Sequence, residues 1–262
     1  MNAVNEIEAP LVDVRRDGAV LTATMNRPAQ FNALSEALMD ALEAELRVAG
    51  ADESVRVVVI AARGKAFCAG HDLREMRAEP GLDYYRTLFA RCSQLMMTIQ
   101  RLPQPVIARV QGLATAAGCQ LVAMCDLAVA ADTARFAVSG VNLGLFCSTP
   151  SVALSRNVAR KQAFEMLVTG DFIDAATALE RGLVNRVVPQ EQLDATIAAL
   201  TESICSKPRE AIAIGKDLFY RQAEMGVDGA YQLAGNTMAC NMMEASALEG
   251  VQAFIDKRKP AW

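Results

Sequence analysis

The 262-residue sequence contains a single histidine, His71. A metal site built from several histidines is therefore excluded, and a Ser-His-Asp triad would depend on this one residue. No Gly-x-Ser-x-Gly motif supplies the nucleophile that an α/β hydrolase needs. P-loop and Gly-x-Gly-x-x-Gly motifs are missing as well, so the common nucleotide-binding loops are excluded.

The chain is also poor in the features typical of nucleic-acid-binding, secreted and membrane proteins. Its 26 lysines and arginines are outnumbered by 30 aspartates and glutamates, so no nucleic-acid partner is expected. The seven cysteines form no Cys-x-x-Cys pair, which is typical of buried thiols in a reducing cytosol. No apolar run reaches the roughly 18 residues that span a bilayer, and the first ten residues resemble neither a signal nor a transit peptide. We therefore expect a cytoplasmic protein without a membrane partner.

Hydrophobic patterning predicts an α/β fold with a large core. Apolar residues make up 52% of the chain. A helix follows the favourable N-cap Ser35, and its Leu38, Leu42 and Leu46 recur every fourth residue. A second helix is expected over residues 82–100. Alternating strands and helices favour partly parallel sheets covered on both faces. Strands are expected over residues 19–25, 56–62, 106–110, 127–131, 135–138 and 184–188.

Beyond residue 190 the pattern changes to helices alone. Breaks at Pro208 and Gly226 help to separate them. A terminal helical layer rich in methionine and leucine needs a surface to pack against. We therefore divide the chain into a core of residues 1–190 and a C-terminal helical region of residues 191–262. The helices are expected over residues 191–206, 209–225, 228–244 and 248–257.

Residues 112–126 combine a turn of small residues with a helix that we expect to begin near Thr115. The apolar strand over residues 106–110 leads into this turn. The first N–H groups of a helix have no partner within the helix, so they can hold a developing negative charge. Small residues let a substrate oxygen approach the backbone. Gln120 then places an amide where a catalyst would need an acid.

Four segments resemble the enoyl-CoA hydratase/isomerase (crotonase) superfamily, and together they cover nearly the whole chain. They are residues 25–34, 64–73, 112–126, and 163–170 followed by 178–185. The resemblance implies a ClpP-like spiral of ββα units with a C-terminal helical trimerisation region. It implies an acyl-CoA thioester as substrate or ligand, with no further cofactor and no metal. It also implies a homotrimer, or a hexamer formed as a dimer of trimers. Residues 141–150 and 257–262 resemble one branch of this superfamily.

By this resemblance, the backbone N–H groups of His71 and Ala117 grip the thioester oxygen. Such donors are fixed in advance, and losing one typically costs about 3–4 kcal/mol of barrier. The His71 side chain has two interpretations: a solvated loop imidazole, or an imidazole at the pocket mouth that aids binding or protonation. We favour the solvated interpretation for the side chain.

The carboxylates of an active hydratase are implied at Gln120 and Gly140, and that of many isomerases at Ser148. None of these residues is an acid. An amide cannot act as a general base near neutral pH, although it can position a water. Each missing acid–base group usually costs about 10²–10⁴-fold in rate. Conventional hydratase activity should therefore be very weak.

The resemblance further implies that CoA bends around residues 27–31 and 65–73, with Arg27 and Lys65 as phosphate contacts. Asp72 is expected to cap local backbone, and Glu165 and Asp126 to be structural. Cys147 is expected to be a buried thiol. Expected to bind the substrate, by the resemblance, are Arg27, Ala29, Phe31, Lys65, Ala69, Gly70, Asp72, Leu73, Gly118, Asn142, Ser148, Phe254 and Lys257. Expected to face the acyl chain are Ser139, Asn142, Cys147, Ser148 and Thr149.

Several functions remain open at this point. The chain could be a weak or non-hydratase enzyme that stabilises a thioester enolate, for example a decarboxylase of a β-carboxyl acyl-CoA. It could bind acyl-CoA without turnover, or act as a scaffold. The alternative is a true enoyl-CoA hydratase of fatty acid metabolism. Fold resemblance alone does not fix the reaction.

Overall fold

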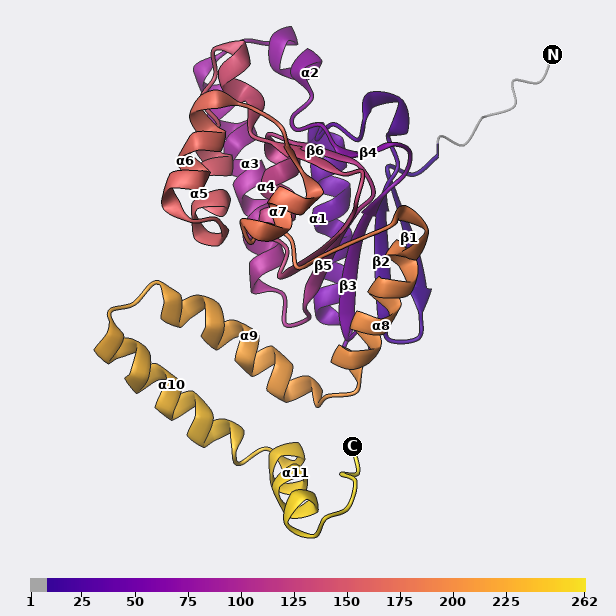
Figure 1. The fold of residues 1–262 in the computed structure, drawn as a ribbon, viewed down its shortest axis with the longest axis vertical. Coiled ribbons are helices and arrows are strands. Elements are labelled where there is room, and N and C mark those ends of the chain that lie inside the picture. The colour runs from indigo at the N-terminus through magenta and orange to yellow at the C-terminus, as the bar shows by residue number, and fades with distance from the viewer. Residues whose placement is uncertain (1–8) are drawn as a thin grey trace, which may run out of the picture.

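The computed structural model describes residues 9–262, which fold into two sheets covered by helices (Figure 1). Residues 1–8, which include most of the segment used to predict targeting, lie outside the described residues. Within the described part, the larger sheet has the strand order β1-β2-β3-β5-β7-β10. β1 pairs with β2 in an antiparallel hairpin, and the remaining neighbours are parallel. The strands are β1 (Val12–Asp17), β2 (Val20–Met25), β3 (Val57–Ala62), β5 (Val106–Val110), β7 (Leu127–Ala131) and β10 (Arg186–Val188).

The smaller sheet runs β4-β6-β8-β9. Its strands are β4 (Ala66–Cys68), β6 (Leu113–Thr115), β8 (Arg135–Ala137) and β9 (Ile173–Asp174). β3, β5 and β7 lie in the larger sheet, and each is followed along the chain by a strand of the smaller sheet: β4, β6 and β8 respectively. A helical segment follows each pair. This repeated path confirms the predicted mixed α/β fold.

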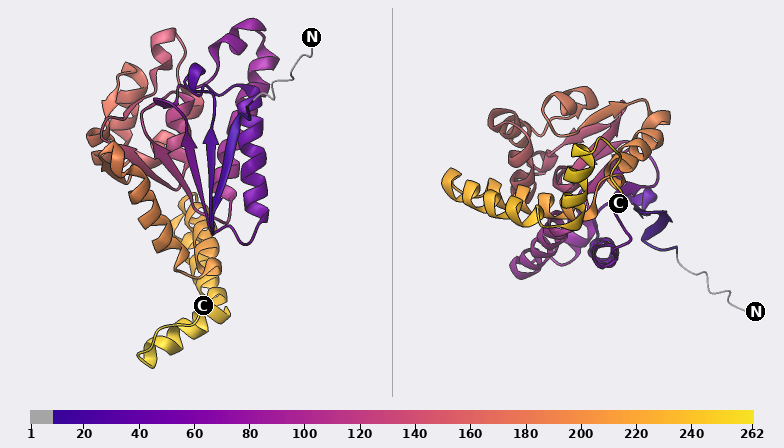
Figure 2. Two further views of the ribbon diagram at one scale, coloured as in Figure 1. Left: turned by 90° about the vertical axis from the view of Figure 1, so that its right-hand side faces the viewer. Right: turned by 90° about the horizontal axis from the view of Figure 1, so that it is seen from below.

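Both faces of the larger sheet are covered, as Figure 2 shows from two further directions. Every residue of β3 is buried, as expected of a strand covered on both sides. α1 (Glu36–Ala51) and α3 (Leu82–Arg101) pack against one another. On the opposite face, Ile197 of α8 (Leu193–Cys205) packs on Val57, Ile107 and Val129.

The first long helix begins as predicted. The Leu38 N–H donates to Oγ of Ser35 at 3.1 Å, and Leu38, Leu42 and Leu46 are buried. The remaining helices are α2 (Leu73–Ala78), α4 (Ala117–Met124), α5 (Ser148–Asn157), α6 (Arg160–Thr169), α7 (Ala175–Glu180), α9 (Arg209–Ala223), α10 (Val227–Asn241) and α11 (Ala245–Ile255). Short 3-10 turns are η1 (Pro28–Gln30), η2 (Ser139–Leu143) and η3 (Gln190–Gln192).

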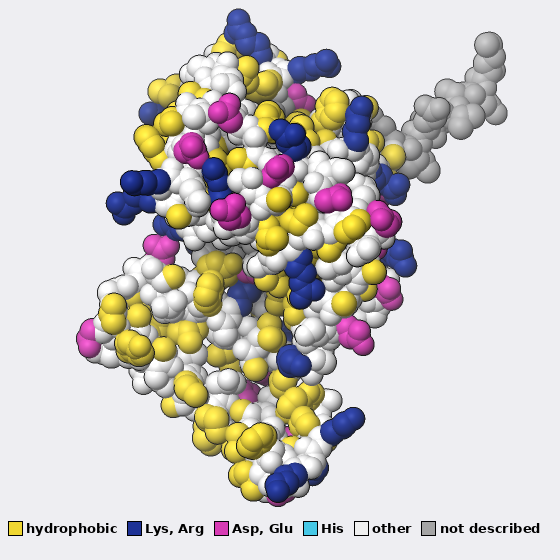
Figure 3. Space-filling view, in the orientation of Figure 1, with side chains coloured by type: hydrophobic (Ala, Val, Ile, Leu, Met, Phe, Trp, Pro, Cys, Tyr) yellow, Lys and Arg dark blue, Asp and Glu magenta, His cyan; other side chains and the backbone are white. Residues whose placement is uncertain are grey.

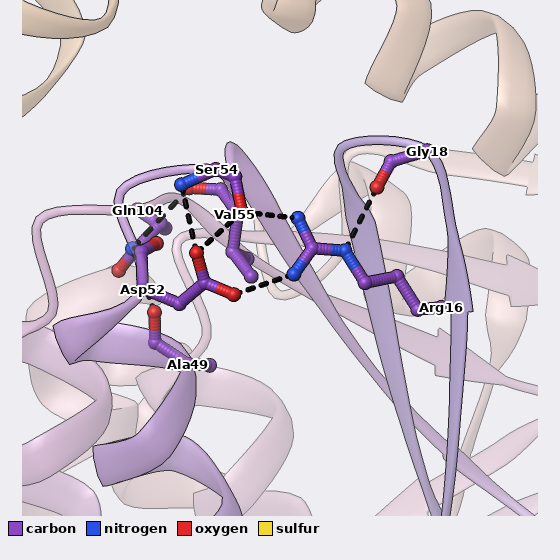
Figure 4. Close-up of polar contacts among 7 residues, drawn as sticks. All are labelled: Arg16, Gly18, Ala49, Asp52, Ser54, Val55 and Gln104. Atoms are coloured by element: carbon purple, nitrogen blue, oxygen red, sulfur yellow. Dashed lines mark hydrogen bonds and ion pairs between the residues drawn. The ribbon is translucent and has the colours of Figure 1, made fainter.

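The turn between α1 and β3 is fixed by Asp52 (Figure 4). Arg16 donates to Asp52 Oδ2 at 2.5 Å, and the Ser54 N–H donates to Asp52 Oδ1 at 2.8 Å. Gln104 donates to the Ala49 carbonyl at 2.9 Å. Hydrogen bonds from Ser54, followed by the one from Arg16, lower the pKa of Asp52 to about 2. This carboxylate therefore joins the β1–β2 hairpin to the end of α1.

A buried ion pair attaches α9 to the core. Lys216 Nζ lies 2.6 Å from Asp126 Oδ2 and also donates to two main-chain carbonyls at 2.9 Å. Tyr220 donates to Asp126 Oδ1 at 2.7 Å. Asp126 also accepts the Val106 N–H at 2.6 Å, which agrees with its predicted structural role. Burial lowers the pKa of Lys216, an effect that the Asp126 carboxylate opposes.

The C-terminal helices leave many large apolar side chains exposed. In Figure 1, α10 and α11 extend away from the two sheets, and Figure 3 shows apolar side chains gathered over this part of the surface. Exposed members include Phe219, Val227, Tyr231, Met238, Met243, Phe254 and Ile255. No helix within residues 9–262 has the length and apolar character needed to cross a membrane.

Candidate functional site

A cavity of about 170 Å³ lies where three strands of the smaller sheet end. His71 follows β4, Ala117 follows β6 and Gly140 follows β8, and all three line the cavity. Because β4, β6 and β8 are parallel neighbours, their carboxyl ends meet at one edge, where ligands of open α/β sheets commonly bind. The other lining residues are Ala69, Leu73, Met76, Phe89, Ala116, Ser139, Leu143, Leu145, Phe146, Cys147, Ser148, Thr149 and Pro150.

Two unusual backbone conformations bring the first two segments together. Gly70 has φ +93°, and a Cβ there would lie 2.9 Å from Cβ of Ala116 and 3.4 Å from the Ala117 nitrogen. Ala116 has φ +50° and ψ −120°, a conformation that a residue with a Cβ rarely adopts. The helix therefore begins at Ala117 rather than near Thr115, because Thr115 completes β6 and the chain reverses at Ala116. Such strain is concentrated at functional sites.

The backbone N–H groups of His71 and Ala117 are both free of acceptors. Neither donates a hydrogen bond to any group within residues 9–262. Leu34 pairs with the flanking residues instead: its N–H donates to the Gly70 carbonyl, and its carbonyl accepts the Asp72 N–H. Two unengaged N–H groups at one cavity can stabilise negative charge on a bound oxygen.

His71 is half-buried and both of its ring nitrogens are buried, so the prediction of a solvated imidazole is wrong. Neither ring nitrogen is exposed, and neither has a hydrogen-bond partner among the described residues. The ring meets Phe89 edge to face, with centroids 5.6 Å apart and an interplanar angle of 68°. Burial lowers the pKa of His71 below its usual value, an effect that the neighbouring Leu34 backbone opposes. The imidazole is therefore neutral at neutral pH.

The three positions at which carboxylates were considered differ in their surroundings. Gln120 is only 5% exposed and does not line the cavity, and its Oε1 has no partner among residues 9–262. Gly140 is buried at the cavity, and Ser148 lies at its edge as the first residue of α5. None of the lining residues is an aspartate or glutamate. The cavity therefore offers His71 and Cys147 as its ionisable side chains.

Cys147 is buried, as predicted. Its Sγ accepts the Gly140 N–H at 3.3 Å, and burial raises the pKa of the thiol. Ser139 and Thr149 line the cavity, and Ser139 Oγ lies 2.9 Å from the hydroxyl of Thr115. Within residues 9–262, no three histidine, cysteine, aspartate or glutamate side chains cluster closely enough to hold a metal ion.

The turns expected to carry CoA lie side by side. The Ala69 N–H donates to the Phe31 carbonyl at 3.1 Å. Arg27 pairs with Asp72 at 3.1 Å and donates to the Ala33 carbonyl at 2.7 Å, so its guanidinium is already engaged. Asp72 also accepts the Arg74 N–H at 3.1 Å, which confirms that it caps local backbone.

Lys65 is exposed next to these turns, with its Nζ 5.9 Å from the ring centroid of Phe31. The segment around Phe31 is fixed by Asn32, a buried residue with φ +53° whose amide donates to the Arg63 and Ala66 carbonyls. Neither Lys65 nor Phe31 lines the cavity, and the neighbouring Ala29 does not line it either.

The remaining predicted residues lie outside the cavity. Asn142 donates to the Gly170 carbonyl at 3.4 Å. A Cβ at Gly118 would collide with the Cys68 carbonyl, so glycine there lets α4 pack directly on β4. Phe254 in α11 and Lys257 beyond it are far from the cavity, at the opposite end of the molecule from α2 (Figure 1).

Sequence reasoning missed most of the apolar wall of the cavity. Met76 comes from α2 and Phe89 from α3, while Leu143, Leu145 and Phe146 come from the segment between β8 and α5. Phe89 is an ordinary apolar position in a helical pattern, which by itself does not indicate a pocket. Pro150 at the start of α5 was missed as well. Glu165 pairs with Arg181 at 2.9 Å, which agrees with its predicted structural role.

Comparison with known proteins agrees with this architecture. A family model described as enoyl-CoA hydratase/isomerase matches residues 15–262. The chain is 45% identical over 260 residues to enoyl-CoA hydratase domain-containing protein 3 of Mus musculus. This alignment covers 99% of this chain and 87% of the mouse protein. The branch predicted from residues 141–150 and 257–262 is therefore confirmed.

Solved structures are similar over almost the whole chain. One described as an enoyl-CoA hydratase of Mycobacterium smegmatis is 64% identical, with a TM-score of 0.96 and coverage of 97% of this chain and 99% of that chain. Human enoyl-CoA hydratase domain-containing protein 3 is 43% identical, with a TM-score of 0.94 and coverage of 97% and 100%.

The expectation of a cytoplasmic protein is contradicted by the curated relatives. The mouse protein and its counterparts in Xenopus laevis, Rattus norvegicus and Homo sapiens are all named as mitochondrial proteins. Scattered thiols cannot separate the two compartments, because they indicate only a reducing environment. With both the family model and these relatives matching nearly its full length, the chain belongs to the enoyl-CoA hydratase/isomerase family.

Proposed function

We propose that this protein binds an acyl-CoA thioester with its carbonyl oxygen between the N–H groups of His71 and Ala117. The two donors would form an oxyanion hole that stabilises an enolate-like charge on the thioester. The protein would do so without the carboxylate pair of a hydratase. Its chemistry would therefore be weak hydration, a non-hydratase reaction of the thioester enolate, or acyl-CoA binding alone.

One observation carries the proposal: two unengaged N–H groups meet at a cavity lined without any aspartate or glutamate. An unengaged donor at a cavity is available to a ligand, whereas a donor in a packed turn is normally satisfied internally. Gly140 supports the part of the proposal that concerns the lack of a carboxylate pair. A Cβ there would lie 2.5 Å from the Leu145 carbonyl oxygen, so the fold leaves no room for a longer side chain at this position.

The CoA portion is proposed to lie along the paired turns outside the cavity. Lys65 is exposed and free to contact a phosphate as a point charge. Arg27 would first have to leave Asp72, so we expect Lys65 to contribute more to CoA affinity. Phe31, 45% exposed beside Lys65, offers an apolar surface to the nucleotide.

The exposed apolar surface of α9, α10 and α11 supports a homotrimer or a dimer of trimers. Side chains such as Tyr231 (77% exposed) and Phe254 (84% exposed) would be costly to leave in water as a contiguous group. In such an assembly, Phe254 and Lys257 would reach the CoA of a neighbouring subunit. Sedimentation equilibrium would detect a mass of three or six chains, and a monomer would contradict this part of the proposal.

A decarboxylase of a β-carboxyl acyl-CoA is a second candidate. Loss of carbon dioxide leaves an enolate that needs an oxyanion hole but no strong base, and a cavity without acids does not repel the substrate carboxylate. The alternative is a true enoyl-CoA hydratase, the name given to the Mycobacterium smegmatis structure. Turnover of malonyl-type thioesters and of crotonyl-CoA separates these possibilities.

The proposed oxyanion hole can be tested by removing one donor. Ala117 is the first residue of α4, where proline is tolerated because its N–H is free in any case. An Ala117→Pro variant loses the donor and also forces Ala116 out of its φ +50°, ψ −120° conformation, because a residue before proline is restricted to extended backbone angles. We expect affinity for butyryl-CoA to fall roughly fivefold in calorimetric titration while affinity for free CoA is unchanged, since one hydrogen bond is worth about 1 kcal/mol.

Ala245→Pro serves as the matched control, because Ala245 is the exposed first residue of α11. This variant should bind both ligands as the unmodified protein does. Equal affinity of the unmodified protein for butyryl-CoA and free CoA would contradict the proposal. Unchanged butyryl-CoA binding in Ala117→Pro would contradict it as well.

A further inference from the structure

The segment between β8 and α5 presents three large apolar side chains to solvent beside the cavity. Leu143 is 69% exposed, Leu145 48% and Phe146 43%, and all three line the cavity. We call these three side chains the apolar edge. Gly140 and Cys147 of the same segment are buried and also line the cavity, which therefore leads from a buried interior to this open edge. Single exposed apolar residues are ordinary, but a group of them beside a cavity marks a binding surface.

The interior of the cavity offers an acyl group little polar contact beyond the two backbone N–H groups. None of the described lining residues is an arginine, lysine, aspartate or glutamate. Ser139 Oγ lies 2.9 Å from the Thr115 hydroxyl, and Ser148 Oγ donates to the Phe146 carbonyl at 3.4 Å. A charged acyl group would lose its hydration here without gaining a partner, which is costly, whereas an aliphatic chain has no hydrogen bonds to lose. The lining therefore favours an uncharged aliphatic chain.

The order of strands in the smaller sheet indicates the direction in which this chain would run. β6 lies between β4 and β8. His71 follows β4 and Ala117 follows β6, whereas the apolar edge follows β8. The turns proposed to carry CoA include residues 65–73, which contain β4 itself. A thioester held between His71 and Ala117, with its CoA on the β4 side, would therefore point its acyl chain towards β8 and the apolar edge.

From these observations we infer that the acyl group of the ligand is an uncharged aliphatic chain longer than four carbons, whose far end packs on the apolar edge. The inference rests on the thioester site proposed above and narrows its class of substrate. It also disfavours the β-carboxyl candidate, because a carboxylate in the cavity would find no cation among the described lining residues. A second copy of this protein is the competing occupant of the apolar edge, and the experiment separates the two.

Calorimetric titration with butyryl-CoA and octanoyl-CoA measures what the additional methylenes contribute. A fully buried methylene raises affinity about fourfold, and one that is half-buried raises it about twofold. Octanoyl-CoA has four more methylenes, so we expect it to bind at least about tenfold more tightly than butyryl-CoA. The double variant Leu143→Ala with Leu145→Ala should lower this ratio to about threefold or less, because most of the apolar edge is then missing.

Val48→Ala is the matched control, because Val48 is an exposed apolar residue of α1 that does not line the cavity. This variant should keep the ratio of the unmodified protein. The ratio compares two ligands on one variant, so a general loss of folded protein or of thioester binding does not change it.

Equal affinity for the two thioesters, with both bound more tightly than free CoA, overturns the inference and leaves the thioester site intact. Failure of both thioesters to bind more tightly than free CoA overturns both proposals. A ratio that stays high in the double variant overturns the inference as well. If sedimentation then shows that this variant has also lost its oligomeric state, the apolar edge belongs to a contact with a second copy.

Discussion

Gly140 donates its N–H to Cys147 Sγ at 3.3 Å, and a Cβ on Gly140 would lie 2.8 Å from that same sulfur. The thiol therefore occupies space that any side chain at position 140 would need. The segment from η2 to α5 closes over Gly140, because the Leu145 N–H also donates to the Gly140 carbonyl at 3.0 Å. A carboxylate at position 140, where the family resemblance implies one, would therefore not fit the packing of this segment, and a single substitution cannot simply introduce it.

Substitution at Gly140 should destabilise the fold. We expect Gly140→Ala to lower the free energy of unfolding by about 1–3 kcal/mol, the usual cost of overpacking. Gly215 in α9 has open space around its Cβ position, so Gly215→Ala should instead be neutral or add up to about 1 kcal/mol. Urea unfolding measures both. A neutral Gly140→Ala variant would show that the segment rearranges freely.

Glycine at the strained turn before α4 should raise the free energy of unfolding, whereas a side chain at Gly140 should lower it. Ala116 has a positive φ, whereas Ala117 begins the helix. Ala116→Gly should raise the free energy of unfolding by about 1 kcal/mol by relieving left-handed strain. Ala117→Gly should lower it by about 0.5–1 kcal/mol. Thermal unfolding of the two variants provides the comparison, and a loss of stability in both would argue against strain at Ala116.

The buried ion pair should contribute far more than a surface pair on the same helix. Lys216→Met leaves the Asp126 carboxylate buried without its cation, and we expect a loss of about 3–5 kcal/mol. The control is Arg221→Met, which breaks an exposed pair with Asp217 and should cost less than about 1 kcal/mol. Chemical unfolding distinguishes them. Equal effects would mean that α9 is held mainly by apolar contacts.

The Asp52 carboxylate should give stability a defined dependence on pH. Its pKa is lowered from 3.8 to about 2 in the folded protein. A depressed pKa stabilises the fold fully above the unfolded value, and this contribution is lost as pH falls from about 4 towards 2. The difference in unfolding free energy between the unmodified protein and Asp52→Asn should therefore be constant near neutrality and shrink below pH 4. A difference that stays constant down to pH 2 would contradict this role.

Much of the fold could be predicted from local patterns. The helix from Ser35 was expected because its cap and its leucine spacing are both local features. The all-apolar β3 was expected because burial on both faces leaves a continuous apolar run. The short strands β4, β6 and β9 were missed, since strands of two or three residues carry almost no periodicity.

The part of the site that could be predicted consists of backbone N–H groups in turns of small residues, because those turns are visible in the local sequence. The segments around His71 and Ala117 were expected to act together, and they do meet at one cavity. The burial of the His71 ring could not be predicted, because it depends on Phe89 from a helix distant in sequence. The ion pair between Arg27 and Asp72 was missed for the same reason. The two residues are 45 positions apart, and local sequence patterns do not indicate contacts at that separation.

The central claim is an oxyanion hole without hydratase carboxylates, and hydration of crotonyl-CoA by the unmodified protein tests it most directly. Two missing acid–base groups predict a rate at least about 10⁴-fold below that of a carboxylate-bearing family member, from a protein that nevertheless binds the thioester. Measured under saturating crotonyl-CoA, a kcat in the ordinary enzyme range of about 1–10³ s⁻¹ would contradict the account.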